Sequence, residues 1–546
     1  KLLGASASIY SQFATHNAHT LAVIYTWAKE KGVEDYEFQC LHGMGETLYD
    51  QVVGANNLGK ACRIYAPVGS HETLLAYLVR RLLENGANSS FVNQIVDEKV
   101  SIEGLIADPF EASRKQGGVP HPGIPLPLEL FGLERKNSAG IDLTDESVLQ
   151  KVGETLAERR DYAVAPLIDG PVAASEWTDI KNPANHHDIV GRVSEATSAD
   201  VETALSRAST FAPEWNQTPA ARRADIISRV ADLFEDNRDE LMALAVREAG
   251  KSLPNAIAEI REAVDFLRYY AAEIHGVQGV QALGPVTCIS PWNFPLAIFT
   301  GQVAAALAAG NVVLAKPAEQ TPIIAHRAVE LFHEAGVPKA ALQFLPGRGE
   351  VVGAGLCNDA RVKGVIFTGS TEVAQLINKT LAQRSVSEGF DIPLIAETGG
   401  QNALIVDSSA LPEQVVQDVM SSAFDSAGQR CSALRVLFLQ EDIAEKTIKM
   451  LKGAMLELRV GAPDRLSTDI GPVIDAEAQE KLQSHILHMQ RHAKSHFSLE
   501  LAPDADAGTF VAPTVLEIGS LAELEHEVFG PVLHIIRYRR SDLPKV

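Results

Sequence analysis

The chain has 546 residues, enough for about three domains that each bury a hydrophobic core. Hydrophobic residues make up 46% of the chain and charged residues 22%, proportions that are typical of soluble globular proteins. The net charge of −22 is spread along the sequence without a basic stripe, which argues against nucleic-acid binding by this chain.

The cysteines are scattered and form no Cys-x-x-Cys pair, so neither a disulfide framework nor a metal site is expected. A reducing cytoplasm fits this usage. No charged segment is followed by an apolar segment and a cleavage site, so nothing points to secretion. The five cysteines are Cys40, Cys62, Cys288, Cys357 and Cys431.

The first 95 or so residues repeat a strand-like run and an amphipathic helix three times. The strand-like runs are SIYSQFATHN, YEFQCLHGM and CRIYAPVG, and the predicted helices are AHTLAVIYTWAKEKG, ETLYDQVVGANN and ETLLAYLVRRLLENG. Repeated βα units predict a parallel sheet or barrel. Three units cannot close an eight-stranded barrel, so we expect residues 1–110 to be its C-terminal part and the other units to lie upstream.

Residues 111–165 combine the run GGVPHPGIPLP with a helical stretch and are predicted to form a linker. A second α/β region follows, from strand-like IVGRV through the helical stretches VETALSRAS and ARRADIISRVADLFEDNRDELMALAVREAG to a last strand, VLHIIRYRR. The apolar stretch Leu296–Ala315 is long enough to span a membrane, but it contains Gln302 and Gly310. A buried helix, a turn and a strand are therefore the better prediction.

Six short motifs follow one another between Pro291 and Pro531: PWNFP, KPAEQTP, FTGSTEVA, ETGG, GQRC and EVFGP. Each is weak alone, but in this order and spacing they resemble the aldehyde dehydrogenase superfamily. The resemblance implies a Rossmann-like NAD-binding domain at residues 166–400 and an α/β catalytic domain at residues 401–546.

The resemblance assigns the chemistry of aldehyde oxidation to three residues. Cys431 in GQRC matches the nucleophile, Glu397 in ETGG the general base, and Asn293 in PWNFP an oxyanion donor that acts with the Cys431 backbone N–H. A lone cysteine is by default a small buried residue, but Cys431 lies 34 positions after Glu397 in the family order. Because Glu397 ends the apolar run PLIAE, we expect its carboxylate to be desolvated.

Lys316 and Glu319 in KPAE match residues that bind the adenine ribose of NAD. They follow the strand-like run NVVLA, and nucleotides bind at the carboxyl ends of strands in open α/β sheets. A carboxylate at this place would repel a 2′-phosphate, which favours NAD over NADP. Without the resemblance, the two residues would be taken for a surface ion pair.

Gly369 and Ser370 follow the strand-like run GVIFT and open a predicted helix, whose N-terminus would bind the pyrophosphate. No GxGxxG motif is present, which agrees with the shorter glycine turn of this superfamily. Glu527 in EVFGP matches the residue that holds the nicotinamide ribose, and Phe529 is expected to lie against the ring.

The N-terminal runs ATHN, EFQCLHGM, CRIYAPVG and YLVRRLLEN resemble the proline dehydrogenase barrel. The resemblance implies that Arg80 and Arg81 bind the carboxylate of proline, a task suited to guanidinium groups. Glu84 lies one turn from Arg80, and the two would otherwise be an ordinary ion pair on a solvated helix face. Tyr65 is expected to face the same pocket from the rim of the barrel.

Thr15, His16 and Gln39 match positions near the flavin of that family, so FAD is the expected cofactor of this module. The family's substrate-binding lysine and aspartate, and further flavin contacts, are expected upstream of Lys1. The flavin site in this chain is therefore expected to be incomplete.

The order of the two modules resembles the bifunctional proline utilization A family of bacteria. It implies that proline is oxidised to pyrroline-5-carboxylate with a membrane quinone as acceptor, and that glutamate γ-semialdehyde is then oxidised to glutamate through a thioester on Cys431. Ser432 is expected to contact the glutamate end of the substrate. A homo-oligomer, with membrane contact that is peripheral at most, is also expected.

Three alternatives remain open. An aldehyde dehydrogenase of other substrate range with an unrelated extension would leave Arg80 and Arg81 unexplained. A proline-responsive DNA-binding repressor would need a further domain upstream of Lys1. The chain could also be catalytically inactive although its full-length parent is active.

Overall fold

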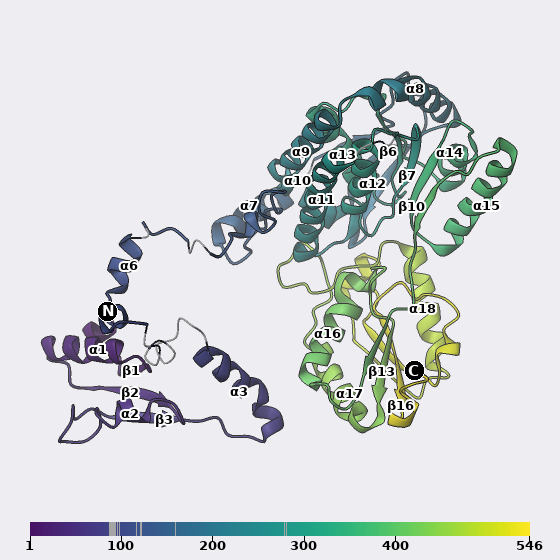
Figure 1. The fold of residues 1–546 in the computed structure, drawn as a ribbon. Coiled ribbons are helices and arrows are strands. Elements are labelled where there is room, and N and C mark those ends of the chain that lie inside the picture. The colour runs from purple at the N-terminus through teal and green to yellow at the C-terminus, as the bar shows by residue number, and fades with distance from the viewer. Residues whose placement is uncertain are drawn as a thin grey trace. The chain divides into compact units, whose positions relative to one another are not determined.

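A computed structural model describes the chain as two compact units, Lys1–Ile124 and Pro125–Val546, and each is treated by itself. The predicted division at residues 110, 165 and 400 stays a prediction. Figure 1 shows the elements of both units. The described residues are 1–86, 94, 97, 99–115, 117–120, 123–158, 160–277, 279 and 281–546.

Unit 1 contains three parallel βα units in chain order, as the sequence predicted. Alternate residues of β2 face opposite sides of the sheet, and Tyr36, Phe38 and Cys40 lie in the hydrophobic core. This is the arrangement of neighbouring units in a (βα)8 barrel. The elements are β1 (Ser11–Ala14), α1 (Ala18–Glu30), β2 (Tyr36–Leu41), α2 (Glu46–Tyr49), β3 (Cys62–Tyr65), α3 (His71–Gly86), α5 (Ile102–Leu105) and α6 (Pro109–Lys115).

The second helix of unit 1 is shorter than predicted. It ends at Tyr49, whereas the prediction extended it through Asn57. Gly54 has a φ of 97°, which an α-helix cannot contain. The Asn57 side-chain amide donates to the carbonyl oxygens of Asp50 and Val53, at 2.8 and 2.7 Å. Turn chemistry therefore replaces the predicted helix here.

Unit 2 is built, within the described residues, on two five-stranded sheets and one three-stranded sheet. We name the larger two the β7 sheet (β11-β10-β7-β8-β9, all parallel) and the β13 sheet (β12-β13-β16-β15-β14, antiparallel only at β14). The strands of the β7 sheet are β7 (Pro285–Ile289), β8 (Val312–Lys316), β9 (Leu342–Phe344), β10 (Gly364–Thr368) and β11 (Leu394–Glu397). Those of the β13 sheet are β12 (Ala403–Val406), β13 (Val436–Gln440), β14 (Ser495–Ser498), β15 (Thr514–Glu517) and β16 (Val532–Tyr538). The small sheet, β4-β6-β5, consists of β4 (Tyr162–Val164), β5 (Trp177–Asn182) and β6 (Asn185–Ser194).

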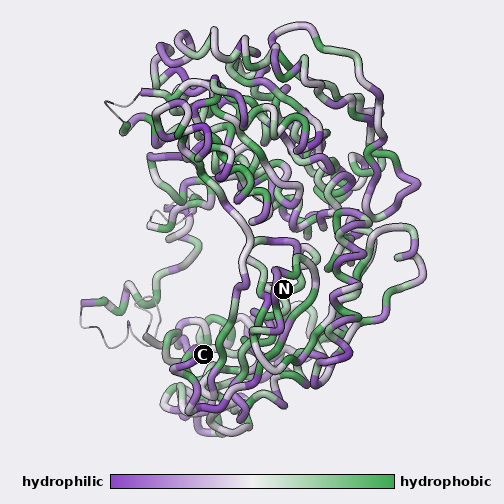
Figure 2. Tube along the Cα trace, turned by 90° about the vertical axis from the view of Figure 1, so that its right-hand side faces the viewer, coloured by the Kyte–Doolittle hydropathy of each residue, from purple (hydrophilic) through white to green (hydrophobic). Residues whose placement is uncertain are grey.

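Helices pack around these sheets, and each large sheet has its own hydrophobic core. Along much of the tube in Figure 2, hydrophobic and hydrophilic residues alternate, as expected for helices with one buried face. The helices of unit 2 include α7 (Glu146–Ala157), α8 (Ser198–Gln217), α9 (Ala220–Asp236), α10 (Arg238–Ala249), α11 (Leu253–Glu273), α12 (Ala297–Ala308), α13 (Pro322–Ala335), α14 (Ala354–Asn358), α15 (Thr371–Glu388), α16 (Pro412–Phe424), α17 (Glu441–Met455) and α18 (Ala476–Gln490).

The apolar stretch Leu296–Ala315 forms the predicted buried helix, turn and strand. Helix α12 is followed by Gly310, which has a φ of 89°, and then by β8, whose residues are all buried. Across the described residues, no helix is long and apolar enough to cross a membrane.

The long helical stretch predicted after Pro219 is broken into α9 and α10 at Asn237. The Asn237 side chain donates to the Leu233 carbonyl oxygen at 2.8 Å and accepts from Arg327 at 3.1 Å. Side-chain bonds of this kind compete with the helical backbone, so the single predicted helix was wrong at this residue.

Two buried glutamates cap helices around the β7 sheet. The Glu259 carboxylate accepts from the backbone N–H groups of Leu296 and Ala297, at 2.9 and 2.8 Å, where α12 begins. Glu248 accepts from the first turn of α13 in the same way, at 2.7 and 2.9 Å. Burial raises the pKa of Glu248 to about 8, and the two backbone hydrogen bonds oppose this shift. Both carboxylates satisfy helix N–H groups that have no partner within the helix.

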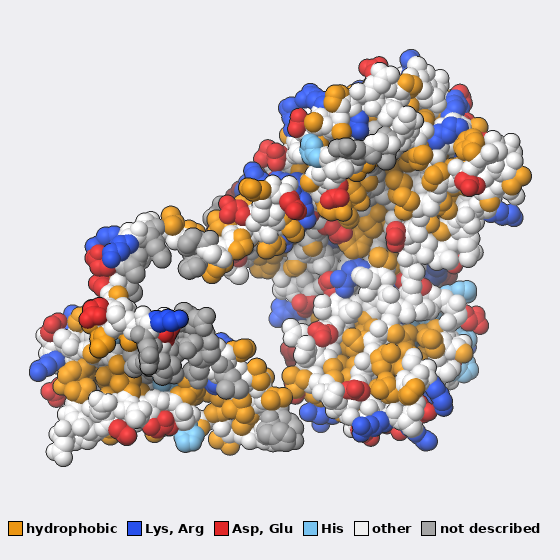
Figure 3. Space-filling model, viewed as in Figure 1, with side chains coloured by type: hydrophobic (Ala, Val, Ile, Leu, Met, Phe, Trp, Pro, Cys, Tyr) orange, Lys and Arg blue, Asp and Glu red, His pale blue; other side chains and the backbone are white. Residues whose placement is uncertain are grey.

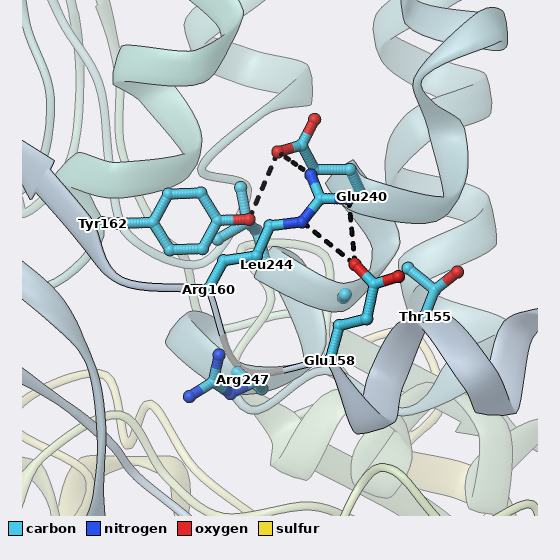
Figure 4. Close-up of a pocket in the computed structure, with 8 residues that line it drawn as sticks. Thr155, Glu158, Arg160, Tyr162, Glu240, Leu244 and Arg247 are labelled. Atoms are coloured by element: carbon cyan, nitrogen blue, oxygen red, sulfur yellow. Dashed lines mark hydrogen bonds and ion pairs between the residues drawn. The ribbon is translucent and has the colours of Figure 1, made fainter.

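The start of the small sheet and the residue two positions before it bind α10. Figure 4 shows Arg160 and Tyr162 pointing toward Glu240, with Arg160 Nη1 at 2.8 Å and the Tyr162 hydroxyl at 3.2 Å from Glu240 Oε1. The space left between them is about 10 Å³, room for one water molecule at most.

A larger groove of about 450 Å³ runs along β12, the edge strand of the β13 sheet. Its apolar lining includes Leu404, Ile405, Leu411 and Leu543. Figure 3 shows hydrophobic side chains gathered in this part of unit 2, where Figure 1 labels β13.

Candidate active site

Cys431 lies in a loop between α16 and β13, which we call the nucleophile loop (residues 425–434). Its side chain is exposed, whereas Gln429, Ala433 and Leu434 on either side are buried. The loop begins with a left-handed turn, in which Ser426, Ala427 and Gly428 have φ angles of 56°, 53° and 64°. Within the described residues, Ser426 and Ala427 alone combine a side chain with a positive φ. The cysteine is thus presented by a strained turn that leads into a buried strand.

Two side-chain amides hold the nucleophile loop. Asn402 donates to the carbonyl oxygens of Cys431 and Ala433, at 2.6 and 3.0 Å. The buried Gln429 donates to the Pro472 carbonyl oxygen at 3.2 Å and accepts from the Ile474 N–H at 2.9 Å. The sequence analysis assigned a role to neither residue, although Gln429 belongs to GQRC and Asn402 lies two positions after ETGG.

Asn293 brings the PWNFP motif to the nucleophile loop. Its side-chain Nδ2 donates to the Gln429 carbonyl oxygen at 3.0 Å, two residues before Cys431. The motif follows β7 and leads into α12, whose first N–H groups bind Glu259. A side-chain amide fixed here can donate a second hydrogen to an oxygen that develops charge beside Cys431.

Glu397 is the last residue of β11, at an edge of the β7 sheet. Its carbonyl oxygen accepts from the Gly369 N–H at 3.1 Å, which joins the ETGG and FTGST motifs. The Glu397 side chain is exposed, so the desolvation expected from the apolar run PLIAE was wrong. An edge strand leaves this side chain in contact with water although its neighbours in sequence are apolar.

Lys316 is buried rather than part of a surface pair, since its side chain is 6% exposed. It ends β8, and its Nζ lies 3.8 Å from Glu319 Oε1 and 3.2 Å from the Pro317 carbonyl oxygen. Burial lowers the pKa of Lys316, and Glu319 opposes the shift. Glu319 also accepts from the Gly349 N–H at 2.8 Å. An ammonium and a carboxylate at a strand end suit the donor and acceptor pattern of ribose hydroxyls.

Gly369 and Ser370 form the predicted turn between β10 and α15. Ser370 caps the helix, and its Oγ accepts from the Val373 N–H at 3.3 Å. A Cβ on Gly369 would lie 2.6 Å from the Phe367 ring, so a larger residue at this position would have to displace that ring. The N–H groups at the start of this 18-residue helix suit a phosphate group.

Glu527 and Phe529 come from the EVFGP motif and meet residues of the other motifs. Glu527 Oε1 lies 3.1 Å from the guanidinium of Arg435, and a Cβ on Gly399 would lie 1.7 Å from Glu527 Oε2. The Phe529 ring packs edge-to-face against Trp292, with centroids 5.7 Å apart. The sequence analysis missed Arg435 and Trp292. The sequence does contain one indication of Arg435, because it is the single charged residue in the otherwise apolar run ALRVLFL.

The structure places Ser432 beside Cys431, with an exposed side chain. The predicted site residues of unit 2 therefore lie on loops and strand ends of the two large sheets. Their contacts join PWNFP to GQRC, ETGG to FTGST, and EVFGP to GQRC and ETGG.

In unit 1, Gln39 and Tyr65 lie on strands β2 and β3. Gln39 alternates along β2 with the core residues Phe38 and Cys40, and Tyr65 pairs with Leu41, which lies on the same face as Gln39. Gln39 and Tyr65 therefore face away from the helix-covered core. His16 Nε2 accepts from the Leu41 N–H at 3.3 Å, and the Thr15 hydroxyl accepts from the Asn17 N–H at 3.1 Å. The Tyr49 hydroxyl, missed by the sequence analysis, donates to the carbonyl oxygens of Thr15 and Gln39.

Arg80 and Arg81 lie on α3, and the Arg81 guanidinium stacks 5.2 Å from the centre of the Tyr77 ring. The side chain of Glu84 lies outside the described part of the chain.

Profiles of two protein families match the chain. That of the aldehyde dehydrogenase family matches residues 172–543, and that of proline dehydrogenase matches residues 1–94. The chain is 57% identical over 566 aligned positions to the bifunctional protein PutA of Escherichia coli, an alignment that covers 100% of this chain and 43% of that protein. It is also 35% identical to a 1-pyrroline-5-carboxylate dehydrogenase of Geobacillus, covering 76% of this chain and 82% of the relative.

Solved structures agree with these matches. Proline utilization A from Bdellovibrio bacteriovorus superposes with a TM-score of 0.89 at 31% identity, covering 99% of this chain and 57% of that one. A 1-pyrroline-5-carboxylate dehydrogenase from Thermus thermophilus gives a TM-score of 0.70 at 31% identity, covering 77% and 83% of the two chains. The chain thus spans about half the length of the bifunctional relatives, 43% of one and 57% of the other.

Proposed function

Because the chain belongs to the aldehyde dehydrogenase family, we propose that it oxidises L-glutamate γ-semialdehyde, the open form of 1-pyrroline-5-carboxylate, to glutamate with NAD. The observation that carries the proposal is the bond between Asn293 Nδ2 and the Gln429 carbonyl oxygen, at 3.0 Å. It joins an oxyanion donor to the loop of an exposed cysteine. The substrate is inferred from relatives that bear the name 1-pyrroline-5-carboxylate dehydrogenase.

In the proposed mechanism, the Cys431 thiolate adds to the carbonyl carbon of the aldehyde. Asn293 Nδ2 and the Cys431 backbone N–H stabilise the oxyanion that forms. After oxidation, the acyl group is a thioester on Cys431. Glu397 removes a proton from water, which attacks the thioester and releases glutamate and the thiol. We propose that Ser432 contacts the glutamate end of the substrate.

The residues around the β7 sheet fit NAD, which supplies the hydride acceptor when bound. Lys316 and Glu319 would hold the adenine ribose, and Gly369 and Ser370 would hold the pyrophosphate at the start of α15. Glu527 would hold the nicotinamide ribose, with Phe529 against the ring. The exposed carboxylate of Glu319 favours NAD over NADP by repelling a 2′-phosphate.

For unit 1 we propose a part of an FAD-dependent proline dehydrogenase, as the match of residues 1–94 supports. Thr15, His16 and Gln39 would lie near the flavin. Arg80, Arg81, Glu84 and Tyr65 would face proline. In the whole protein, a quinone would accept the electrons at the inner face of the membrane, and the enzyme would be a cytoplasmic homo-oligomer.

The test is NADH formation by the whole native protein with pyrroline-5-carboxylate, acetaldehyde or succinic semialdehyde. We expect kcat/KM to be highest for pyrroline-5-carboxylate, and a higher value for either simple aldehyde would refute the proposed substrate. Cys431→Ala should abolish turnover, whereas Cys62→Ala, which removes a half-buried thiol in unit 1, should leave NADH formation unchanged. NADH formation by Cys431→Ala at the parent rate would refute the proposed mechanism.

A further inference from the structure

Arg435 is a charged side chain with no solvent exposure, at the end of the nucleophile loop and directly before β13. Arginine is seldom buried completely unless its guanidinium is paired, because removing the charge from water is costly. Burial lowers the pKa of Arg435, and Glu527 opposes the shift. Hydrophobic packing alone does not explain why a charged side chain is buried at this position.

The two arms of the guanidinium join two segments of the candidate active site, the nucleophile loop and the EVFGP motif. Nη1 donates to the carbonyl oxygens of Gly428 at 2.7 Å and Gly530 at 3.3 Å. Nη2 donates to the Arg430 carbonyl oxygen at 3.0 Å and to Glu527 Oε1 at 3.1 Å. The Phe529 ring lies 5.1 Å from the guanidinium carbon. One side chain thus binds both flanks of Gln429 and the carboxylate proposed to hold the nicotinamide ribose.

The carbonyl groups that Arg435 binds belong to strained or closely packed backbone. Gly428 completes the left-handed turn with Ser426 and Ala427, a conformation that is unfavourable for residues with a side chain. A Cβ on Gly428 would lie 2.2 Å from the Gly530 carbonyl oxygen, so the two backbones touch. The Gly530 carbonyl oxygen also accepts from the Val532 N–H at 2.8 Å, whereas the buried Gly428 carbonyl oxygen relies on Arg435 to replace water.

The backbone of Arg435 is itself held from two sides. Its N–H donates to the Asn402 carbonyl oxygen at 3.0 Å, and its carbonyl oxygen accepts from the His534 N–H at 3.0 Å. Neighbouring β12 and β16 therefore fix the origin of the side chain. A guanidinium with a fixed base and four acceptors has little freedom to move.

We propose that Arg435 is a positioning residue that keeps the Cys431 loop in register with the Glu527 carboxylate. The proposal rests on the function proposed for Cys431 and deepens it. Arg435 acts through the carbonyl groups of Gly428 and Arg430 and through Glu527, and does not itself touch substrate. One side chain thereby fixes the relative positions of the Cys431 thiol and the Glu527 carboxylate, although these residues lie 96 positions apart in the sequence.

The test compares Arg435→Lys with Arg384→Lys in the whole native protein. Arg384 is a matched control, because it is also buried and donates to the carbonyl oxygens of Cys357 and Val362 while it pairs with Glu388. Lysine keeps the charge but cannot reach four acceptors in a plane. We expect Arg435→Lys to lower kcat by about 10- to 100-fold and to raise KM for NAD, because small misplacements of reacting groups have effects of this size.

A second readout needs neither aldehyde nor NAD. The rate at which iodoacetamide alkylates Cys431, followed by mass spectrometry of the cysteine peptide, should change at least threefold in Arg435→Lys and stay constant in Arg384→Lys. If both variants lower the thermal midpoint equally and neither changes kcat or alkylation, Arg435 is structural only and the proposal is wrong. If Arg435→Lys does not fold, Glu527→Gln replaces it. That variant should change the alkylation rate through Arg435, and an unchanged rate would overturn the proposal.

Failure of this proposal can be distinguished from failure of the proposed function. Activity that survives Cys431→Ala removes the function. Activity that is lost in Cys431→Ala but kept at the parent level in Arg435→Lys removes only the positioning role.

Discussion

The two large sheets of unit 2 supply site residues in different ways. On the β7 sheet, Lys316 and Glu397 end parallel strands, and Ser370 caps the helix that follows a third strand. On the β13 sheet, Cys431 precedes its strand and depends on two side chains that donate to backbone carbonyl oxygens, the half-buried Asn402 and the buried Arg435. The positions of the site residues on the β7 sheet are determined by strand register, and their side chains can be exposed. Those on the β13 sheet are determined by tertiary hydrogen bonds, so substitutions of buried residues there should have larger effects.

Asn293→Ala should have the largest effect, because it removes the hydrogen bond that joins a loop of the β7 sheet to the nucleophile loop of the β13 sheet. We expect kcat to fall about 10²- to 10³-fold, the usual result of losing one oxyanion donor. The measurement is steady-state NADH formation. Asn137→Ala is the control, since its amide also donates to a carbonyl oxygen, that of Pro127, at 2.9 Å. A kcat within twofold of the parent would show that the Asn293 contact does not serve catalysis.

The pH dependence of stability tests the role of a buried histidine of the β13 sheet, His534 on β16. Burial lowers the pKa of His534 to about 4, while its Nδ1 lies 3.1 Å from the Arg435 carbonyl oxygen and its Nε2 2.9 Å from His485 Nε2. An unfolded histidine titrates near pH 6.5, so the folded state favours the neutral ring. The contribution of His534 to the free energy of unfolding should be constant above about pH 6.5 and fall by up to about 3 kcal/mol as the pH drops to 4.

Urea unfolding at several pH values measures this dependence. His534→Asn should remove much of it, and His496→Asn, an exposed histidine on β14, should leave it intact. Burial also lowers the pKa of His326 to about 4, so part of the dependence should persist in His534→Asn. Equal pH profiles in both variants would mean that His534 is not a source of it.

A smaller effect is expected on the β7 sheet, where Glu319→Gln should reduce the preference for NAD over NADP. Loss of the negative charge removes the repulsion of a 2′-phosphate, and we expect the ratio of the two kcat/KM values to change about tenfold, or about 1.4 kcal/mol. Glu330→Gln on α13 is the control, because its side chain is equally exposed at 43%. An unchanged ratio would place cofactor choice elsewhere.

The smallest effect concerns the strained turn itself. Ala427→Gly should raise the free energy of unfolding by about 0.5–1 kcal/mol, because a left-handed residue with a Cβ costs about 1–2 kcal/mol and the flexibility of glycine offsets part of this. Ala423→Gly, four residues earlier and buried in α16, should instead lower it by about 1 kcal/mol. Urea unfolding compares the two. Destabilisation by Ala427→Gly would contradict the idea that strain is stored at this turn.

The same contrast between the sheets explains what sequence could reveal. Lys316 and Ser370 could be found because a strand-like run predicts where the strand ends, and parallel strands gather those ends at one edge. Arg435 could not, because its acceptors are carbonyl groups that only the tertiary fold brings together. The break at Asn237 and the exposure of Glu397 likewise depend on neighbours distant in sequence. The motif order predicted the family, but local pattern could not show which buried charges hold the motifs in place.

The glutamate caps of α12 and α13 have a consequence for folding. Each cap joins the first turn of a helix to a residue 37 or 75 positions earlier, on α11 or α10. Neither helix starts with a local side-chain cap. A peptide of residues 297–308 should therefore show little helix in water, because 12 residues are too few for a stable isolated helix and its cap lies elsewhere. In the intact chain, α10 and α11 must be in place before these two helices acquire complete first turns.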